Sequence, residues 1–168
     1  LIDLCKKEQV PISEIMLRYE MERSEMSREA ILARLKDNLD VMKESISQGL
    51  DPNSTAKGFF SGGDAMKLLD HARKSHMGCD MADIIAASMA VVEVNASMGR
   101  IVAAPTAGAS GILPAVLIIC GERQKYTEDQ LLEGLLNAGA IGRIIAANAS
   151  IAGASGGCQA ETGSAAAM

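Results

Sequence analysis

The chain has 168 residues, of which 48% are hydrophobic, and this is enough for a single domain with a real core. A net charge of −5, without a basic cluster interleaved with aromatic residues, argues against nucleic acid as a partner. Only 2% of the residues are aromatic, so aliphatic and thioether side chains must fill the interior, as suits closely packed helices. The composition therefore predicts an all-α fold, a compact helical domain over residues 1–168.

Charged residues are concentrated early in the chain, because residues 1–100 hold 29 of the 37. This predicts charged peripheral helices over residues 1–57, followed by a core with small-residue site loops over residues 58–168. Four cysteines lie far apart and the sequence opens without an apolar signal segment, which favours a cytoplasmic location. Prolines and glycines interrupt the long uncharged segment 101–121, so no membrane partner is expected.

Three helix patterns occupy the first half of the chain. Ser13 is a candidate cap for a short helix, and Ser27 is a candidate cap for a longer helix that ends at Gly49. Asp64 is expected to cap a third helix that runs to about Ser75. The longer helix has one apolar stripe, because its large aliphatic residues recur at spacings of three and four: Ile31, Leu35, Leu39, Met42 and Ile46.

Three further helices are expected in the second half. One has Pro114 in its first turn, where proline is tolerated. The next begins with a capping-box pattern at Thr127 and Gln130, and its glycines imply very close neighbours: Gly134, Gly139 and Gly142. A helix that precedes both of these in the chain is expected to start at Asp80 and to end at Gly99. Its buried side is expected to consist of Met81, Ile84, Ile85, Met89 and Val92.

The pentapeptide AGASG occurs twice, at Ala107–Gly111 and Ala152–Gly156, each time just before an expected helix. Glycine and alanine leave little bulk over the backbone amides, so each copy can approach a ligand closely. We interpret the copies as two loops that face one site. Gly62-Gly63 is either a flexible connection to its helix or a third such loop. The 45-residue spacing of the copies fits a structural repeat or chance in an Ala/Gly-rich region.

Cys158 is the candidate for chemistry, because it stands among glycines and polar residues at the start of the last expected helix. Helix N-terminal amides favour a thiolate, the form that binds metals. His71 and His76 are five residues apart and do not form an i, i+4 metal pair. Gly153–Gly157 matches a serine-hydrolase nucleophile elbow, but a helical pattern precedes it and no histidine follows His76. The remaining cysteines are expected to be structural or incidental: Cys5, Cys79 and Cys120.

Three motifs occur together: SGGDA at Ser61–Ala65, APTAGASGILPA within Asn95–Leu117, and GGCQAE within Asn148–Met168. With the opening LIDLCKKEQVPISEIMLRYEME, they make nearly the whole chain similar to the iron–sulfur-dependent L-serine dehydratases, specifically the alpha chain of the two-subunit kind. The resemblance implies a helical catalytic domain that converts L-serine to pyruvate and ammonia by elimination of water. It also implies a beta-chain partner and an oligomer.

The resemblance further implies a [4Fe-4S] cluster held by three cysteines, with one iron open to the substrate as a Lewis acid. Cys158, in GGCQAE, matches the first of these ligands, whereas the other two belong to segments further toward the C-terminus in the family. The final residues SAAAM carry no helix stop signal, so the sequence looks like a fragment. The fragment alone is expected to lack the cluster and the activity.

The small-residue loops supply the predicted substrate-binding residues, and two of them, Ser61–Asp64 and Thr106–Gly111, are expected to hold the amino acid's carboxylate. Glu161, three residues after Cys158, is either a catalytic acid/base group or a carboxylate that caps the first turn, unless the beta chain supplies the base. A non-enzymatic helical subunit and a metal-free small-molecule-binding domain remain alternatives. The predicted substrate-binding residues are Ser61, Gly62, Gly63, Asp64, Thr106, Ala107, Gly108, Ser110, Asn148 and Ser150.

Overall fold

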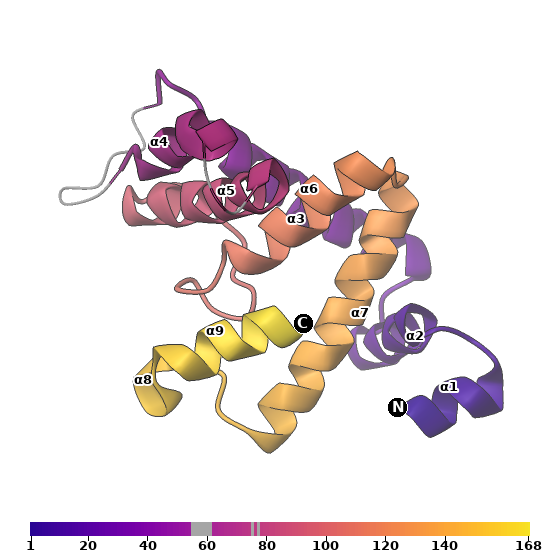
Figure 1. Ribbon diagram of the computed structural model, residues 1–168. Coiled ribbons are helices and arrows are strands. Elements are labelled where there is room, and N and C mark those ends of the chain that lie inside the picture. Colours follow the sequence, from indigo (N-terminus) through magenta and orange to yellow (C-terminus); the bar gives the residue numbers. More distant parts are fainter. Residues whose placement is uncertain (55–61, 75, 77) are drawn as a thin grey trace.

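The structure, a computed structural model, describes residues 1–54, 62–74, 76 and 78–168, and every regular element among them is helical (Figure 1). This confirms the all-α prediction. In chain order the elements are α1 (Ile2–Glu8), α2 (Ile12–Ser24), α3 (Arg28–Gly49), α4 (Asp64–His71), a 3₁₀ turn (Ala72–Lys74), α5 (Gly78–Ala96), α6 (Ile112–Gln124), α7 (Glu128–Asn148), α8 (Gly153–Gly156) and α9 (Cys158–Ala167).

α3 has a charged outer face and an apolar inner face. The Ser27 hydroxyl accepts a hydrogen bond from the Ala30 amide at 3.2 Å, and Gly49 is the last helical residue, so both predicted ends are confirmed. α3 lies within the expected peripheral region 1–57, yet it contributes three residues of its stripe to the core. The core comprises Leu39, Met42, Ile46, Ala87, Val91, Ala104, Ala115, Ile118, Leu131, Leu132 and Leu135.

The buried face of α5 is not the predicted one. Met81 and Val92, which were expected inside, are 51% and 41% exposed. α3 approaches α5 so closely that a Cβ added to Gly49 would lie 2.6 Å from the Cβ of Ala90, which leaves room for small side chains only. Ile84, Ile85 and Met89 are therefore only partly buried. The buried face consists mainly of Ala82, Ala86, Ala87, Ala90, Val91 and Val94.

Two predicted helix starts are displaced by one or two residues. α2 begins at Ile12 after an extended Pro11, so Ser13 does not cap this helix but is buried within its first turn. α5 begins at Gly78 and not at Asp80. Displacements of this size are within the usual uncertainty of helix ends, and they leave the order of the helices unchanged.

The starts of α6 and α7 agree with the prediction. Pro114 is buried in the first turn of α6. The Thr127 hydroxyl accepts from the Gln130 amide at 3.3 Å, and the Gln130 side chain accepts from the Thr127 amide at 2.9 Å, which completes the capping box. Segment 101–121 is divided between a loop and α6, and within the described residues no helix has both the length and the apolar character of a membrane span.

α7 packs against α2, α3, α6 and α9, and the last turn of α9 meets α7 (Figure 1). Two of its three glycines have the close neighbours that were predicted. A Cβ on Gly134 would lie 2.8 Å from the Leu117 side chain, and one on Gly142 would lie 2.9 Å from the Met168 side chain. Gly139 has nothing within 4 Å of its Cβ position. The two crowded glycines therefore leave space on α7 for the Leu117 and Met168 side chains.

Candidate functional site

The two AGASG copies meet at one carboxylate, that of Glu161. Thr106 Oγ1 donates a hydrogen bond to Glu161 Oε2 at 2.7 Å. A Cβ on Gly108 would lie 2.6 Å from Glu161 Oε1, and a Cβ on Gly153 would lie 2.9 Å from Glu161 Cδ. Gly108 and Gly153 are the second residues of the two copies, and a Cβ at either position would require the Glu161 carboxylate to move. We name these four residues, Thr106, Gly108, Gly153 and Glu161, the Glu161 cluster.

The two copies have different local structures although both contact Glu161. In the first copy Ala109 and Ser110 are buried, and the Ser110 hydroxyl donates to the Ala107 carbonyl at 2.7 Å. Asn95 at the end of α5 also donates to this carbonyl, at 3.3 Å. The second copy forms the short, mostly exposed helix α8, where the sequence predicted a loop. The Ser110 hydroxyl therefore supports its own loop, and its predicted role in substrate binding stays a prediction.

Cys158 is exposed and is the first residue of α9, one helical turn before Glu161. Gly157 precedes it with φ of +78°, a conformation that favours glycine, and has nothing within 4 Å of its Cβ position. The thiol is therefore accessible and close in sequence to the Glu161 cluster. Among the described residues, no three or more His, Cys, Asp or Glu side chains are grouped to hold a metal.

Two predicted substrate-binding residues are exposed: Asn148, the last residue of α7, and Ser150, in the connection to α8. The Asn148 side chain donates to the Ile144 carbonyl at 2.8 Å, within its own helix. The Ser150 and Ser155 hydroxyls are hydrogen-bonded at 2.5 Å, a contact that the sequence analysis did not anticipate. These hydroxyls lie on the segment that leads to Cys158.

The start of α4 differs from the prediction in one respect. Asp64 is the first residue of the helix, and Gly63, with φ of +83°, occupies the cap position. The Asp64 carboxylate accepts from Lys67 Nζ at 2.8 Å, and this contact raises the pKa of Lys67. The prediction that Asp64 caps α4 is therefore wrong. Ser61 lies outside the described residues.

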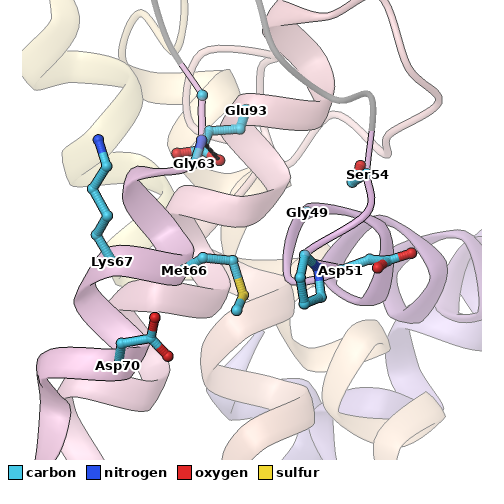
Figure 2. A pocket seen from close by; sticks show the side chains of 10 residues that line it. Gly49, Asp51, Ser54, Gly63, Met66, Lys67, Asp70 and Glu93 are labelled. Atoms are coloured by element: carbon cyan, nitrogen blue, oxygen red, sulfur yellow. Dashed lines mark hydrogen bonds between the residues drawn. The ribbon is translucent and has the colours of Figure 1, made fainter.

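The amides at the start of α4 bind a carboxylate from α5. The Gly63 amide donates to Glu93 Oε2 at 2.9 Å, and the Asp64 and Ala65 amides donate to Glu93 Oε1 at 2.8 and 3.0 Å. Figure 2 shows Glu93 against the Gly63 backbone, at a pocket of about 460 Å³ between α3 and α4. Glu93 is not among the predicted site residues. Its signal was available, because Glu93 is the only charged residue between Asp83 and Arg100.

The family model described as "Serine dehydratase alpha chain" matches residues 7–168. The chain belongs to the serine dehydratase alpha chain family. It is 42% identical to "Probable L-serine dehydratase, alpha chain" of Bacillus subtilis (strain 168), over 100% of this chain and 56% of the relative. It is 38% identical to "L-serine dehydratase, alpha chain" of Peptoniphilus asaccharolyticus, over 100% and 58% of the two chains. It is 40% identical to "L-serine dehydratase" of Mycobacterium tuberculosis (strain CDC 1551 / Oshkosh), over 100% and 38%.

This member of the serine dehydratase alpha chain family thus spans little more than half the length of the two alpha chains it matches. Its Glu161 directs the carboxylate to Thr106, 55 residues earlier, and not to the amides of its own helix. This contact favours a role for Glu161 between the two loops over the predicted cap of α9. The acid/base role remains a prediction.

Proposed function

We propose that this chain is part of a cytoplasmic L-serine dehydratase that acts with a beta chain and converts L-serine to pyruvate and ammonia. The observation that carries the proposal is the position of Glu161, which both AGASG loops contact one helical turn from the exposed Cys158. The relatives support the same reaction, because their names include L-serine dehydratase and two of those names include alpha chain.

The donor chemistry of Cys158 fits one ligand of a [4Fe-4S] cluster. Thiolates are the donors that iron–sulfur clusters use, and the Cys158 thiol is exposed at the first residue of α9. Since the described residues provide no complete donor set, the other ligands would come from the rest of the protein. When bound, the cluster supplies a Lewis-acidic iron that polarises the serine hydroxyl.

Elimination of water from L-serine takes a proton from Cα and hydroxide from Cβ, and it leaves aminoacrylate. Glu161 is the candidate proton acceptor in this chain, because its carboxylate is only partly buried and Thr106 holds Oε2 while Oε1 faces Gly108. Aminoacrylate then tautomerises and takes up water to give pyruvate and ammonia. In this assignment Thr106 orients the carboxylate, and Asn148 and Ser150 are exposed candidates for binding the amino acid.

The test uses the complete alpha chain with its beta chain, reconstituted with iron and sulfide without oxygen. We expect a brown protein that forms pyruvate from L-serine. Cys158→Ala should lose bound iron, visible absorption and pyruvate formation, because a thiolate ligand is removed. Cys120→Ala, on α6, should keep all three and serves as the matched control. Intact cluster and activity in Cys158→Ala would refute the ligand assignment.

The same preparation separates the two alternatives. A wild-type assembly that takes up iron and sulfide but forms no pyruvate would favour a non-enzymatic subunit. Binding of L-serine that persists unchanged in Cys158→Ala, measured by calorimetry without iron, would favour a metal-free binding domain.

A further inference from the structure

The carboxylate of Glu93 occupies amides that the sequence predicted to be free for a substrate. Glu93 is only 7% exposed, and it accepts three hydrogen bonds from the first turn of α4 at 2.8 to 3.0 Å. The first amides of a helix have no partner within the helix, and the helix dipole favours a negative charge beside them. The Glu93 side chain therefore provides the hydrogen-bond acceptors for the backbone amides of Gly63, Asp64 and Ala65.

A substrate carboxylate could reach these amides only by displacing Glu93. Displacement would break all three of the hydrogen bonds that now pair this carboxylate. A buried carboxylate that loses its donors is strongly disfavoured. The Gly63–Ala65 amides are therefore committed to the fold and are not available to an amino acid.

α5 connects this segment to the first AGASG loop. Two residues after Glu93, Asn95 donates to the Ala107 carbonyl at 3.3 Å. Two turns earlier, Ser88 supports the same loop, because a Cβ on Gly111 would collide with its carbonyl oxygen. The last three turns of α5 thus hold both the segment Gly62–Ala65 and the loop that carries Thr106. Cys158 lies on α9, which makes no such contact with Glu93.

We propose that Glu93 is a positioning residue, which fixes the segment Gly62–Ala65 and the adjoining loop for L-serine binding without contacting the substrate. The proposal rests on the proposed function. In this proposal Glu93 accepts the hydrogen bonds from the Gly63–Ala65 amides that a substrate carboxylate was expected to accept. The substrate carboxylate then binds elsewhere than at the start of α4.

Glu93→Gln tests the proposal in the complete, iron-loaded enzyme. A glutamine has one acceptor oxygen, and its NH₂ group would face an amide N–H, so the three bonds cannot all form. We expect the KM for L-serine to rise about tenfold while kcat changes less than about threefold and bound iron is unchanged. Glu93→Asp keeps both acceptors on a shorter side chain and should lie between wild type and Glu93→Gln. Asp70→Asn, at the same pocket but away from the amides, should leave KM unchanged (Figure 2).

Amide hydrogen exchange gives a readout that needs neither activity nor a folded variant. In the wild-type alpha chain, the Gly63, Asp64 and Ala65 amides should exchange slowly, although first-turn amides without partners exchange readily. Exchange at the rate of free amides in the wild type would overturn the proposal. So would an unchanged KM in a Glu93→Gln enzyme whose amides have lost protection. A wild-type enzyme that makes no pyruvate would instead refute the proposed function, and the exchange result would still stand.

Discussion

Replacing Gly108 by alanine tests whether the Glu161 carboxylate occupies the position described. The new Cβ would lie 2.6 Å from Oε1 and 3.1 Å from Cδ, and real Cβ contacts essentially never fall below 3.0 Å. The carboxylate must therefore withdraw and stretch or lose its 2.7 Å hydrogen bond from Thr106. A hydrogen bond to a charged group contributes about 1.5–3 kcal/mol, and because Glu161 is partly exposed we expect a loss of about 1–2 kcal/mol.

The assay is urea unfolding followed by circular dichroism, compared with Gly163→Ala as the control. Gly163 lies on α9, the same helix as Glu161, and has nothing within 4 Å of its Cβ position. Alanine there should raise the free energy of unfolding by up to about 1 kcal/mol, because glycine is a poor helix former. The two Gly→Ala changes should therefore shift the free energy of unfolding in opposite directions: Gly108→Ala should lower it and Gly163→Ala should raise it.

A double-mutant cycle identifies the atom that collides. In a Glu161→Ala background the carboxylate is gone, so Gly108→Ala should cost much less than in the wild type. An undiminished cost in that background would mean that Gly108 is crowded by something other than Glu161. Equal effects of Gly108→Ala and Gly163→Ala in the wild type would mean that the carboxylate does not lie at Gly108, and the Glu161 cluster would then be refuted.

Two further predictions concern stability. Gly49→Ala should destabilise the chain by about 3 kcal/mol, because the new Cβ would press on the α5 backbone at Ala90. Gly139→Ala, on α7, serves as the control and should not destabilise the chain, because nothing lies within 4 Å of its Cβ position. Equal unfolding midpoints of the two variants would contradict the described packing of α3 on α5. Hydrogen bonds from Arg28 and Arg18 lower the pKa of Glu14 below 4.5, so its contribution is present above that pH and is lost as pH falls through the lowered value. Because both arginines are half exposed, Glu14→Gln should cost less than about 1 kcal/mol near pH 7, and this difference from wild type should shrink as the pH falls below 4.5 in urea unfolding. A difference that stays constant with pH would contradict this assignment.

Helix ends that depend on neighbouring residues were predictable from the sequence. Ser27 and the Thr127–Gln130 pair act over three residues, and both caps form as predicted. Ser13 failed because Pro11 already sets the start of α2, and proline is favoured near a helix start for its own backbone reasons. Local signals therefore identified most helices, and two of their starts were wrong by one or two residues. The ends of α4 and α5, at His71 and Ala96, lie three or more residues before the predicted ends at about Ser75 and at Gly99.

The buried face of α5 could not be predicted from periodicity alone. Met81 and Val92 fit an apolar stripe, but the distance between α3 and α5 decides which side is buried, and that distance is set by Gly49. The partners of Glu93 also depend on tertiary structure. Its isolation in an uncharged segment was visible in the sequence, but its donors lie about 30 residues earlier, so no local pattern could identify them.

The candidate site was predictable in its parts but not in its arrangement. The sequence identified both pentapeptides, Cys158 and Glu161 as the residues of interest. It did not indicate that Gly108 and Gly153 contact the same carboxylate, or that the buried Ser110 uses its hydroxyl within its own loop. These facts depend on how α9 lies against the loop before α6, which is a tertiary contact.

The length of α7 gives its two crowded glycines an effect far from where they lie. A helix of 21 residues is about 31 Å long, so a tilt of about 2° about its capped end displaces the other end by about 1 Å. That other end leads to α8 and Cys158, and an error of about 1 Å in a reactive group can cost about a hundredfold in rate. The position of the Cys158 thiol is therefore sensitive to how α7 packs against its neighbours, and Gly134 and Gly142 lie at two of these contacts.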